Sequence, residues 1–260
     1  TIPDSYIYNE NDHHSCLTGI GIPIYNSSVF FYLPRTYQGC YKVPDGIKII
    51  ARGAFLKCKE LTKVDLPDSV LEICAFAFGD CDNLQDVTLP KRLTNISRGT
   101  FRNCNSLRQI TVPNGVKSIQ SGAFRGCTSL ISITIPSSVT RIDAFAFKDC
   151  NKIKSVLLPE SVDVSGLAFE NCDSLANSII VQNVLVKVPN SLYGKYVVDD
   201  KIEVISDGAF QGCNNIIEII LPNNIKEIGK RCFEDCENLE CLKENYHDNV
   251  LSVLDTYPIS

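Results

Sequence analysis

Apolar residues recur along this chain in columns with a period of about 23 residues, which lies within the range of known repeat architectures. Phenylalanine stands at positions 55, 78, 101, 124, 147, 169, 210 and 233, so the steps are nearly equal except for the long one from 169 to 210. A cysteine follows each of these phenylalanines three residues later, and an isoleucine or valine precedes each by five residues. Eight repetitions of three columns indicate an internal repeat, which determines the fold class.

Each repeat predicts two short strands joined by turns. Apolar and mostly polar residues alternate in the segment 61–67 (LTKVDLP), as expected of a half-buried strand. Its final proline ends the strand because proline cannot donate the next ladder hydrogen bond. A second extended segment follows at 70–73. The Ala-Phe-x-x-Cys arc has no strand alternation and is too short for a full helix, so it is interpreted as a tight turn or a single helical turn.

Stacking of the repeats explains how each one buries its apolar side. Equivalent residues of successive coils lie above one another at the strand spacing of about 4.7–4.9 Å and form continuous internal ladders. Parallel strands joined by crossovers are expected to wind right-handed. The sequence therefore predicts a single right-handed repeat solenoid over residues 1–260, rich in short parallel strands, with turn or short-helix arcs.

Two similar segments interrupt the repeat. Residues 183–199 (NVLVKVPNSLYGKYVVD) have the pattern of strand, turn and strand, and residues 28–44 (SVFFYLPRTYQGCYKVP) match them at a constant offset of 155. We expect both segments to be β-hairpins inserted into the solenoid. Such a hairpin either widens or bends the solenoid or forms one rim of a binding surface.

The two ends depart from the repeat. Residues 1–27 are interpreted as a degenerate N-terminal coil or cap. The string at 1–5 resembles the interior string at 134–138, which indicates that the sequence begins inside a coil. Residues 245–260 no longer follow the pattern, and we expect them to form a C-terminal cap over the last unpaired strand.

The repeat closely resembles that of the BspA-like leucine-rich-repeat family. That family is characterised by Ala-Phe-x-x-Cys-x-x-Leu and Ile-x-Leu/Ile-Pro signatures, as in residues 130–136 (LISITIP), and the resemblance covers about residues 44–242. It implies a leucine-rich-repeat solenoid. It also implies a secreted or cell-surface protein with an adhesive or binding role, as is typical of family members in bacteria and some mucosal protists.

The 13 cysteines indicate packing rather than chemistry. The eight in the repeat column would have Cβ atoms about one coil rise apart, which exceeds the ~3.8 Å mean of disulfides. We expect these thiols to be buried and reduced. Cys74 and Cys232 belong to the same arcs and are interpreted as packing residues. The redox state of Cys16, Cys40 and Cys241 stays open.

No pattern in the sequence favours catalysis or a cofactor. The three histidines include the adjacent pair His13 and His14, which lacks a third metal ligand, and no nucleophile, phosphate-loop or zinc-protease motif is present. The formal charge is −5, with charges of both signs scattered along the chain, which argues against nucleic-acid binding. No apolar run reaches the ~20 residues of a membrane span. We predict a protein that is not an enzyme and binds no cofactor or metal.

A protein partner is expected on the outward face of the strands or on the hairpins. If the strands form one parallel sheet, most outward residues are polar, and a few aliphatic exceptions form a patch toward the C-terminal half. Tyrosines on the hairpins are also typical of interfaces. The candidate partner-binding residues are Arg108, Ile131, Lys154, Leu157, Ile217, Ile220, Tyr37 and Tyr193.

The sequence thus favours a protein-protein interaction or adhesion module that binds a host or matrix protein. Two alternatives stay open. One is a structural spacer or stalk of a surface protein, and the other is a scaffold for an enzyme domain outside this sequence.

Overall fold

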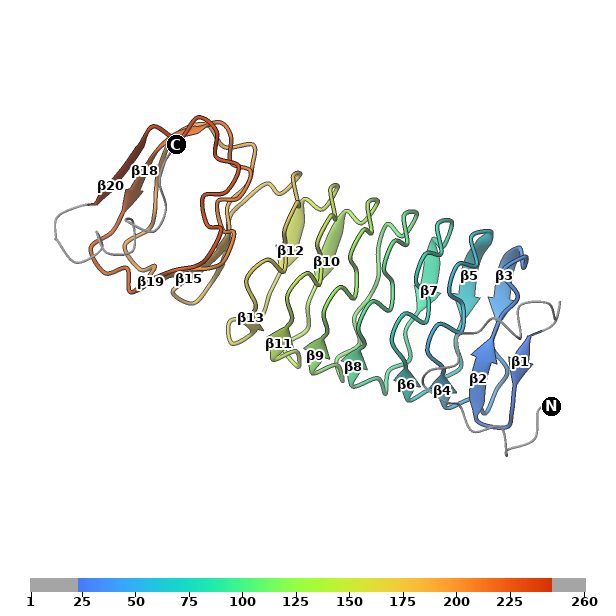
Figure 1. Cartoon of the computed structure of the whole chain (residues 1–260). Coiled ribbons are helices and arrows are strands. Elements are labelled where there is room, and N and C mark those ends of the chain that lie inside the picture. Colours follow the sequence, from blue (N-terminus) through green and yellow to red (C-terminus); the bar gives the residue numbers. More distant parts are fainter. Residues whose placement is uncertain (1–22, 245–260) are drawn as a thin grey trace.

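The chain folds into an elongated β-solenoid, which a computed structural model describes over residues 23–244 (Figure 1). Successive coils place short strands in two rows on opposite sides of the body, and turns connect the rows. No residue between 23 and 244 is helical. The Ala-Phe-x-x-Cys arcs are therefore turns, and the alternative of a helical turn is wrong.

The strands of both rows are short. The first row contains β3 (Gly39–Lys42), β5 (Leu61–Asp65), β7 (Asp86–Thr88), β10 (Ser132–Thr134), β12 (Ser155–Leu157), β16 (Gly194–Val197), β18 (Ile216–Leu221) and β20 (Cys241–Glu244). The second row contains β1 (Ile24–Tyr25), β2 (Val29–Tyr32), β4 (Ile49–Ile50), β6 (Glu72–Ile73), β8 (Asn95–Ile96), β9 (Ser118–Ile119), β11 (Arg141–Ile142), β13 (Asp163–Val164), β14 (Ile179–Val181), β15 (Val184–Lys187), β17 (Val204–Ile205) and β19 (Glu227–Ile228).

The pairing of strands follows the repeat. β5 and β7 are parallel, with Lys63 opposite Asp86, and β10 and β12 are parallel, with Ser132 opposite Ser155. The two residues of each pair are one sequence period apart, so one coil equals one repeat. The predicted solenoid of short parallel strands is confirmed.

A column of phenylalanine rings forms the centre of the core. The rings from Phe30 to Phe169 stack on one another through the coils, with centroids 4.7 Å apart at the closest step and 5.5 Å apart at the widest. All of these rings are fully or almost fully buried. Phe30 lies in β2, outside the sequence repeat, and stacks on Phe55 at 4.9 Å. It therefore extends the column by one coil.

Each arc turns through two residues with left-handed backbone conformation, one on either side of the phenylalanine. Around Phe101 these residues are Gly99 and Asn103, with φ of 61° and 58°. Glycine and asparagine tolerate this conformation better than other residues. Gly99 is required for a second reason, because a Cβ atom there would clash with the ring of Phe76 in the preceding coil.

Two antiparallel hairpins are present, but their bounds differ from the predicted 28–44 and 183–199. β1 pairs with β2 and β14 pairs with β15, so the hairpins lie at 24–32 and 179–187. The strands predicted to close the hairpins, β3 and β16, instead pair in parallel with the next coils, through β5 and β18.

Backbone hydrogen bonds show why the segment 28–44 is not a hairpin. The Leu33 N–H donates to the carbonyl of Ala54 at 2.8 Å, and the Gly39 N–H donates to that of Glu60 at 2.9 Å. The segment that resembles a hairpin bend is therefore the arc of a coil that stacks on the next one. Val29 lies opposite Ile49, so this coil is shorter than the repeat.

The solenoid bends at a second short coil, in which Val184 lies opposite Val204 (Figure 1). Among the strands between residues 23 and 244, β12 pairs only with β10 and β13 only with β11, so neither row of strands continues directly across this point. The arcs still meet there, since the Leu167 N–H donates to the carbonyl of Asp207 at 3.3 Å. The coils stay joined at their arcs and separate at their strands, which produces the bend.

The predicted caps fall mostly outside the described residues. Of the segment 1–27, only 23–27 are described, and they include β1. The segment 245–260 lies entirely outside them.

Candidate protein-binding surface

The first row of strands is divided into three sheets. They are β3-β5-β7, β10-β12 and β16-β18-β20. The single continuous sheet on which the outward columns were predicted is therefore wrong. The gaps fall between β7 and β10 and between β12 and β16.

This division separates the predicted aliphatic patch into two parts. Ile131 and Leu157 lie on the sheet of β10 and β12, and both are exposed. Ile217 is exposed on β18, beyond the bend. Ile220 is only half-buried in the same strand, because its neighbours in the ladder, Val197 and Lys243, flank it on both sides.

The remaining predicted residues differ in their solvent exposure. Arg108 and Lys154 are exposed, and neither forms an ion pair with any residue between 23 and 244. Tyr193 is 85% exposed. Tyr37 is half-buried, since its hydroxyl donates to the carbonyl of Cys40 at 2.9 Å and its ring packs edge-on against Tyr41.

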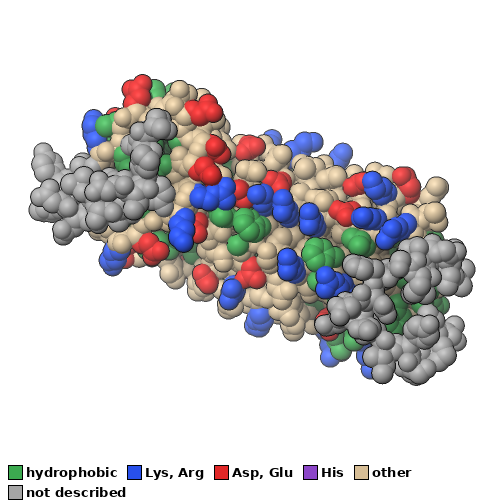
Figure 2. Space-filling model, viewed as in Figure 1, with side chains coloured by type: hydrophobic (Ala, Val, Ile, Leu, Met, Phe, Trp, Pro, Cys, Tyr) green, Lys and Arg blue, Asp and Glu red, His purple; other side chains and the backbone are tan. Residues whose placement is uncertain are grey.

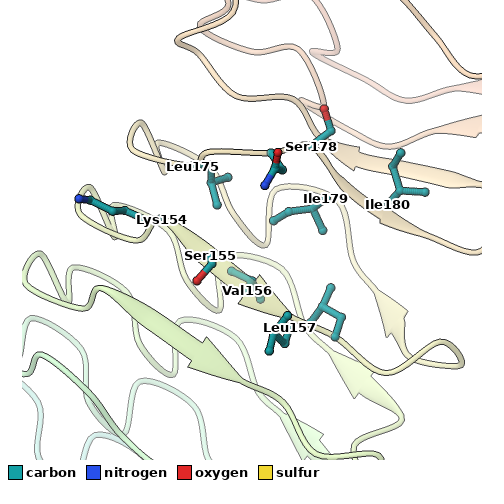
Figure 3. Close-up of a pocket in the computed structure, with 10 residues that line it drawn as sticks. Lys154, Ser155, Val156, Leu157, Leu175, Ser178, Ile179 and Ile180 are labelled. Atoms are coloured by element: carbon teal, nitrogen blue, oxygen red, sulfur yellow. The ribbon is translucent and has the colours of Figure 1, made fainter.

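A hollow of about 320 Å³ lies beside β12, where the second hairpin leaves the solenoid (Figure 3). Its apolar wall includes Leu157, Leu175, Ile179 and Ile180, and Lys154 lies at one end. Leu157 is 64% exposed and Ile180 is 37% exposed. The sequence interpretation missed Ile180, although the apolar run Ile179 to Val181 before the predicted hairpin was a signal for a strand.

The strand edges next to this hollow are open. Within the described part of the chain, β12 pairs only with β10, and β14 pairs only with β15. A single hydrogen bond starts the next coil along β12, from the Ala176 N–H to the carbonyl of Lys154 at 3.0 Å, and the chain then leaves. Backbone groups of an edge strand therefore accompany the exposed aliphatic side chains.

A buried carboxylate forms ion pairs with the arcs on both sides of the bend. The side chain of Glu170 is 4% exposed and accepts from Lys148 Nζ at 2.7 Å. Arg231, which lies 61 residues later, reaches the other oxygen of Glu170 at 3.4 Å. Arg231 also pairs with Glu234. The arcs on the two sides of the bend are thus joined by an ion-pair network.

The cysteine column forms an internal ladder of thiol hydrogen bonds. Cys104 Sγ donates to the carbonyl of Phe78 at 3.2 Å, and Cys127 Sγ donates to that of Phe101 at 3.1 Å. Burial raises the pKa of the Cys127 thiol to about 12 and that of Cys104 well above its ordinary range. Seven of the eight column cysteines are buried, but Cys236 is half-buried, so the predicted burial of the whole column is wrong at this position. Cys232 is also buried, Cys74 and Cys241 are half-buried, and Cys40 is exposed, whereas Cys16 lies outside the described residues.

We expect thiol labelling to follow this division. At pH 8, iodoacetamide should modify Cys40 rapidly and leave the column from Cys81 to Cys172 unmodified, because a buried neutral thiol is a poor nucleophile. Peptide mass spectrometry gives the rate at each site, and labelling in urea provides the fully reactive control. Rapid native labelling of the column would contradict its burial. Since folding raises the pKa of Cys127 from about 9 to about 12, stability should fall as the pH rises through that range.

The described part of the chain shows neither a metal cluster nor a membrane-spanning helix. Between residues 23 and 244, no group of three His, Cys, Asp or Glu side chains is arranged to hold a metal ion. None of the elements in the same range is a helix that is long and apolar enough to cross a bilayer.

Comparison with known families agrees with this architecture. Residues 40–130 and 190–252 match the model of the BspA type leucine-rich repeat region, in six copies. The chain belongs to the BspA type leucine-rich repeat family. The resemblance deduced from the arcs is confirmed. The unmatched segment between the two matches contains β10 to β15 and therefore the bend of this BspA type solenoid.

Several solved structures have the same fold. A protein from Bacteroides ovatus is 28% identical, with a TM-score of 0.66, over 84% of this chain and 66% of its own. A leucine-rich cell surface protein from Faecalibacterium prausnitzii is 24% identical, with a TM-score of 0.52, over 83% of this chain and 62% of its own. The pneumococcal vaccine antigen PcpA is 16% identical, with a TM-score of 0.59, over 84% of this chain and 64% of its own.

This BspA type chain spans less than two thirds of the length of each of these structures. A search of the curated proteins gave no match.

Proposed function

We propose that this chain is a protein-binding module of a secreted or cell-surface protein, and that its partner binds at the hollow beside β12. Membership of the BspA type family supports a binding role, and the similar protein from Faecalibacterium prausnitzii is described as a cell surface protein. The observation that carries the proposal is the open edge of β12 next to Leu157 and Ile180.

Two physical features support this location. An edge strand presents unpaired N–H and C=O groups, and proteins usually cover such edges or protect them with charge. Here the edge faces a hollow with exposed aliphatic side chains, so an extended segment of a partner gains backbone hydrogen bonds and apolar contacts together. Lys154 at the end of the hollow favours a segment that carries a carboxylate.

A charge placed in the hollow should weaken partner binding. Leu157→Asp puts a carboxylate where apolar surface must be buried, and we expect it to weaken partner binding at least about tenfold. The matched control is Leu71→Asp, since Leu71 is a 38% exposed leucine next to β6 in the other row of strands. The measurement is affinity capture of host-cell surface and matrix proteins on the immobilised chain, followed by titration of each captured protein.

The outcomes separate this proposal from its alternatives. Loss of the same proteins with Leu157→Asp but not with Leu71→Asp supports the hollow as the binding site. If Leu157→Asp retains every partner while Ile217→Asp loses them, binding occurs on β18 beyond the bend. If the chain captures no protein, the role of a spacer or stalk is favoured.

A further inference from the structure

The middle of the solenoid contains no carboxylate. Residues 87–142 include no Asp or Glu, whereas Lys and Arg occur at positions 91, 92, 98, 102, 108, 117, 125 and 141. The segment 199–244 has the opposite balance, with eleven Asp or Glu and five Lys or Arg. The charges of the chain are therefore unevenly distributed. Although the net charge of the whole chain is −5, the charged side chains of residues 87–142 are all positive, and we call this segment the basic belt. Figure 2 shows Lys and Arg side chains over the middle of the body.

Most cations of the basic belt are uncompensated. Among the residues that the structure describes, Arg125 and Arg141 are the only belt cations that form ion pairs, with Asp149 and Asp143, which both lie outside the belt. The other six form no ion pair with any residue between 23 and 244. Because sequence neighbours are spatial neighbours in a solenoid, these charges act on one short section of the body. The local field there is positive despite the net charge of the chain.

A groove crosses the basic belt on the first row of strands. Two adjoining hollows, of about 730 and 620 Å³, share Gln109 and Ser132 as lining residues. Lys91 lines the larger hollow and Arg108 the smaller one. Among the described residues that line them, the only carboxylate is that of Asp86, which already pairs with Lys63 at 3.4 Å.

The backbone around the same groove is incompletely paired. It lies in the gap between the sheets β3-β5-β7 and β10-β12, where one coil has no strand. In the described part of the chain, the N–H groups of the five residues from Arg108 to Val112 donate no hydrogen bond. In the stack such N–H groups point toward the neighbouring coil, as that of Ile131 does toward the carbonyl of Arg108, so the ligand contacts of the groove come from its side chains.

Hydroxyl and amide side chains complete the lining of the groove. Thr88, Thr111 and Thr134 occupy equivalent positions of three successive coils, and Gln109 and Ser132 lie beside them. The belt contains no exposed aromatic residue, since its only rings, Phe101 and Phe124, are fully buried. Stacking of nucleic-acid bases needs such rings, whereas sugar hydroxyls need hydrogen-bonding side chains.

We infer that this groove binds a linear sulfated polysaccharide. Lys91 and Arg108 contact the sulfates, and the threonine column contacts the sugar hydroxyls. This site is separate from the hollow beside β12 and takes a different class of ligand. The inference therefore does not depend on the proposed protein-binding function.

The test uses immobilised heparin as the sulfated polysaccharide and chemically desulfated heparin as its matched partner. The unaltered chain should bind heparin and not the desulfated polymer. Lys91→Gln with Arg108→Gln should raise the Kd at least about tenfold, since two charge-assisted contacts are lost. The matched control is Lys48→Gln with Lys230→Gln, which removes two exposed cations outside the belt that form no ion pair with described residues.

A second variant separates recognition from simple charge attraction. Thr111→Val with Thr134→Val leaves every charge in place and should still raise the Kd about threefold or more. Equal weakening by the groove and control pairs would overturn the site, and so would binding of desulfated heparin with unchanged affinity. If single-stranded DNA binds as tightly as heparin and responds to the same variants, the polysaccharide assignment is wrong.

Discussion

Replacing Phe124 by alanine is expected to lower the free energy of unfolding by about 3–5 kcal/mol. The ring is fully buried between Phe101 and Phe147, with centroid distances of 5.5 and 5.3 Å. Its removal leaves a cavity that the neighbouring rings cannot fill, because backbone hydrogen bonds fix the coils on both sides. The Phe124 N–H donates to the carbonyl of Ala146 at 2.8 Å, and the Phe101 N–H donates to that of Ala123 at 2.8 Å.

The matched control for this variant is Phe145→Gly. Phe145 is also a phenylalanine of an arc, but it is half-buried and has a φ of 63°, which disfavours a bulky side chain. Glycine relieves that strain, so the net change should be within about 1 kcal/mol. Urea unfolding followed by tyrosine fluorescence measures both variants, and hydrogen exchange identifies the coils that open. Equal losses from the two variants would show that the ring column does not hold the core.

The columns of the repeat were predictable from sequence because solenoid packing is local and periodic. A residue that recurs once in every period has only one place in a stacked coil, so the burial of Phe101 and Cys104 follows directly from the spacing. The register also follows, since equal coil lengths place Lys63 opposite Asp86. The family resemblance predicts the same fold.

The hairpins were not predictable in the same way. Alternation identifies a strand but not its ladder partner, and the segment from Pro34 to Gly39 has the composition of a hairpin bend. Its hydrogen bonds to Ala54 and Glu60 form only when the next coil is in place. The gaps between sheets depend on such contacts too, so the single sheet was predicted wrongly. Ile220 is half-buried rather than exposed because its ladder neighbours flank it on both sides.

The basic belt is a different case, because it was visible in the sequence. Counting charges over the whole chain averages the acidic end against the middle. Counting them coil by coil separates the segment 87–142 from 199–244. For a repeat protein the coil is the relevant unit of charge, since each coil contacts only its neighbours.

Removing the cation at the bend should be the second most disruptive change. Lys148→Met leaves the Glu170 carboxylate buried, with only the 3.4 Å contact from Arg231. Because a buried charge that loses its partner is strongly unfavourable, we expect a loss of about 3 kcal/mol. In the preceding coil, Arg125→Met is the matched control. Its pair with Asp149 is more exposed, so the loss should stay below about 1 kcal/mol.

A double-mutant cycle shows whether the pair itself is responsible. Lys148→Met with Glu170→Met removes both charges and should restore stability to within about 1 kcal/mol of the unaltered chain, because no buried charge is left unpaired. The coupling energy also cancels the contribution of Lys148 to the ring of Phe145, which it contacts at 5.4 Å. A coupling energy near zero in urea unfolding would mean that the bend is held by packing alone. A coupling energy toward the upper end of the range for contacting residues, about 2 kcal/mol or more, would identify the carboxylate as the group that fixes the bend, and with it the open edge of β12.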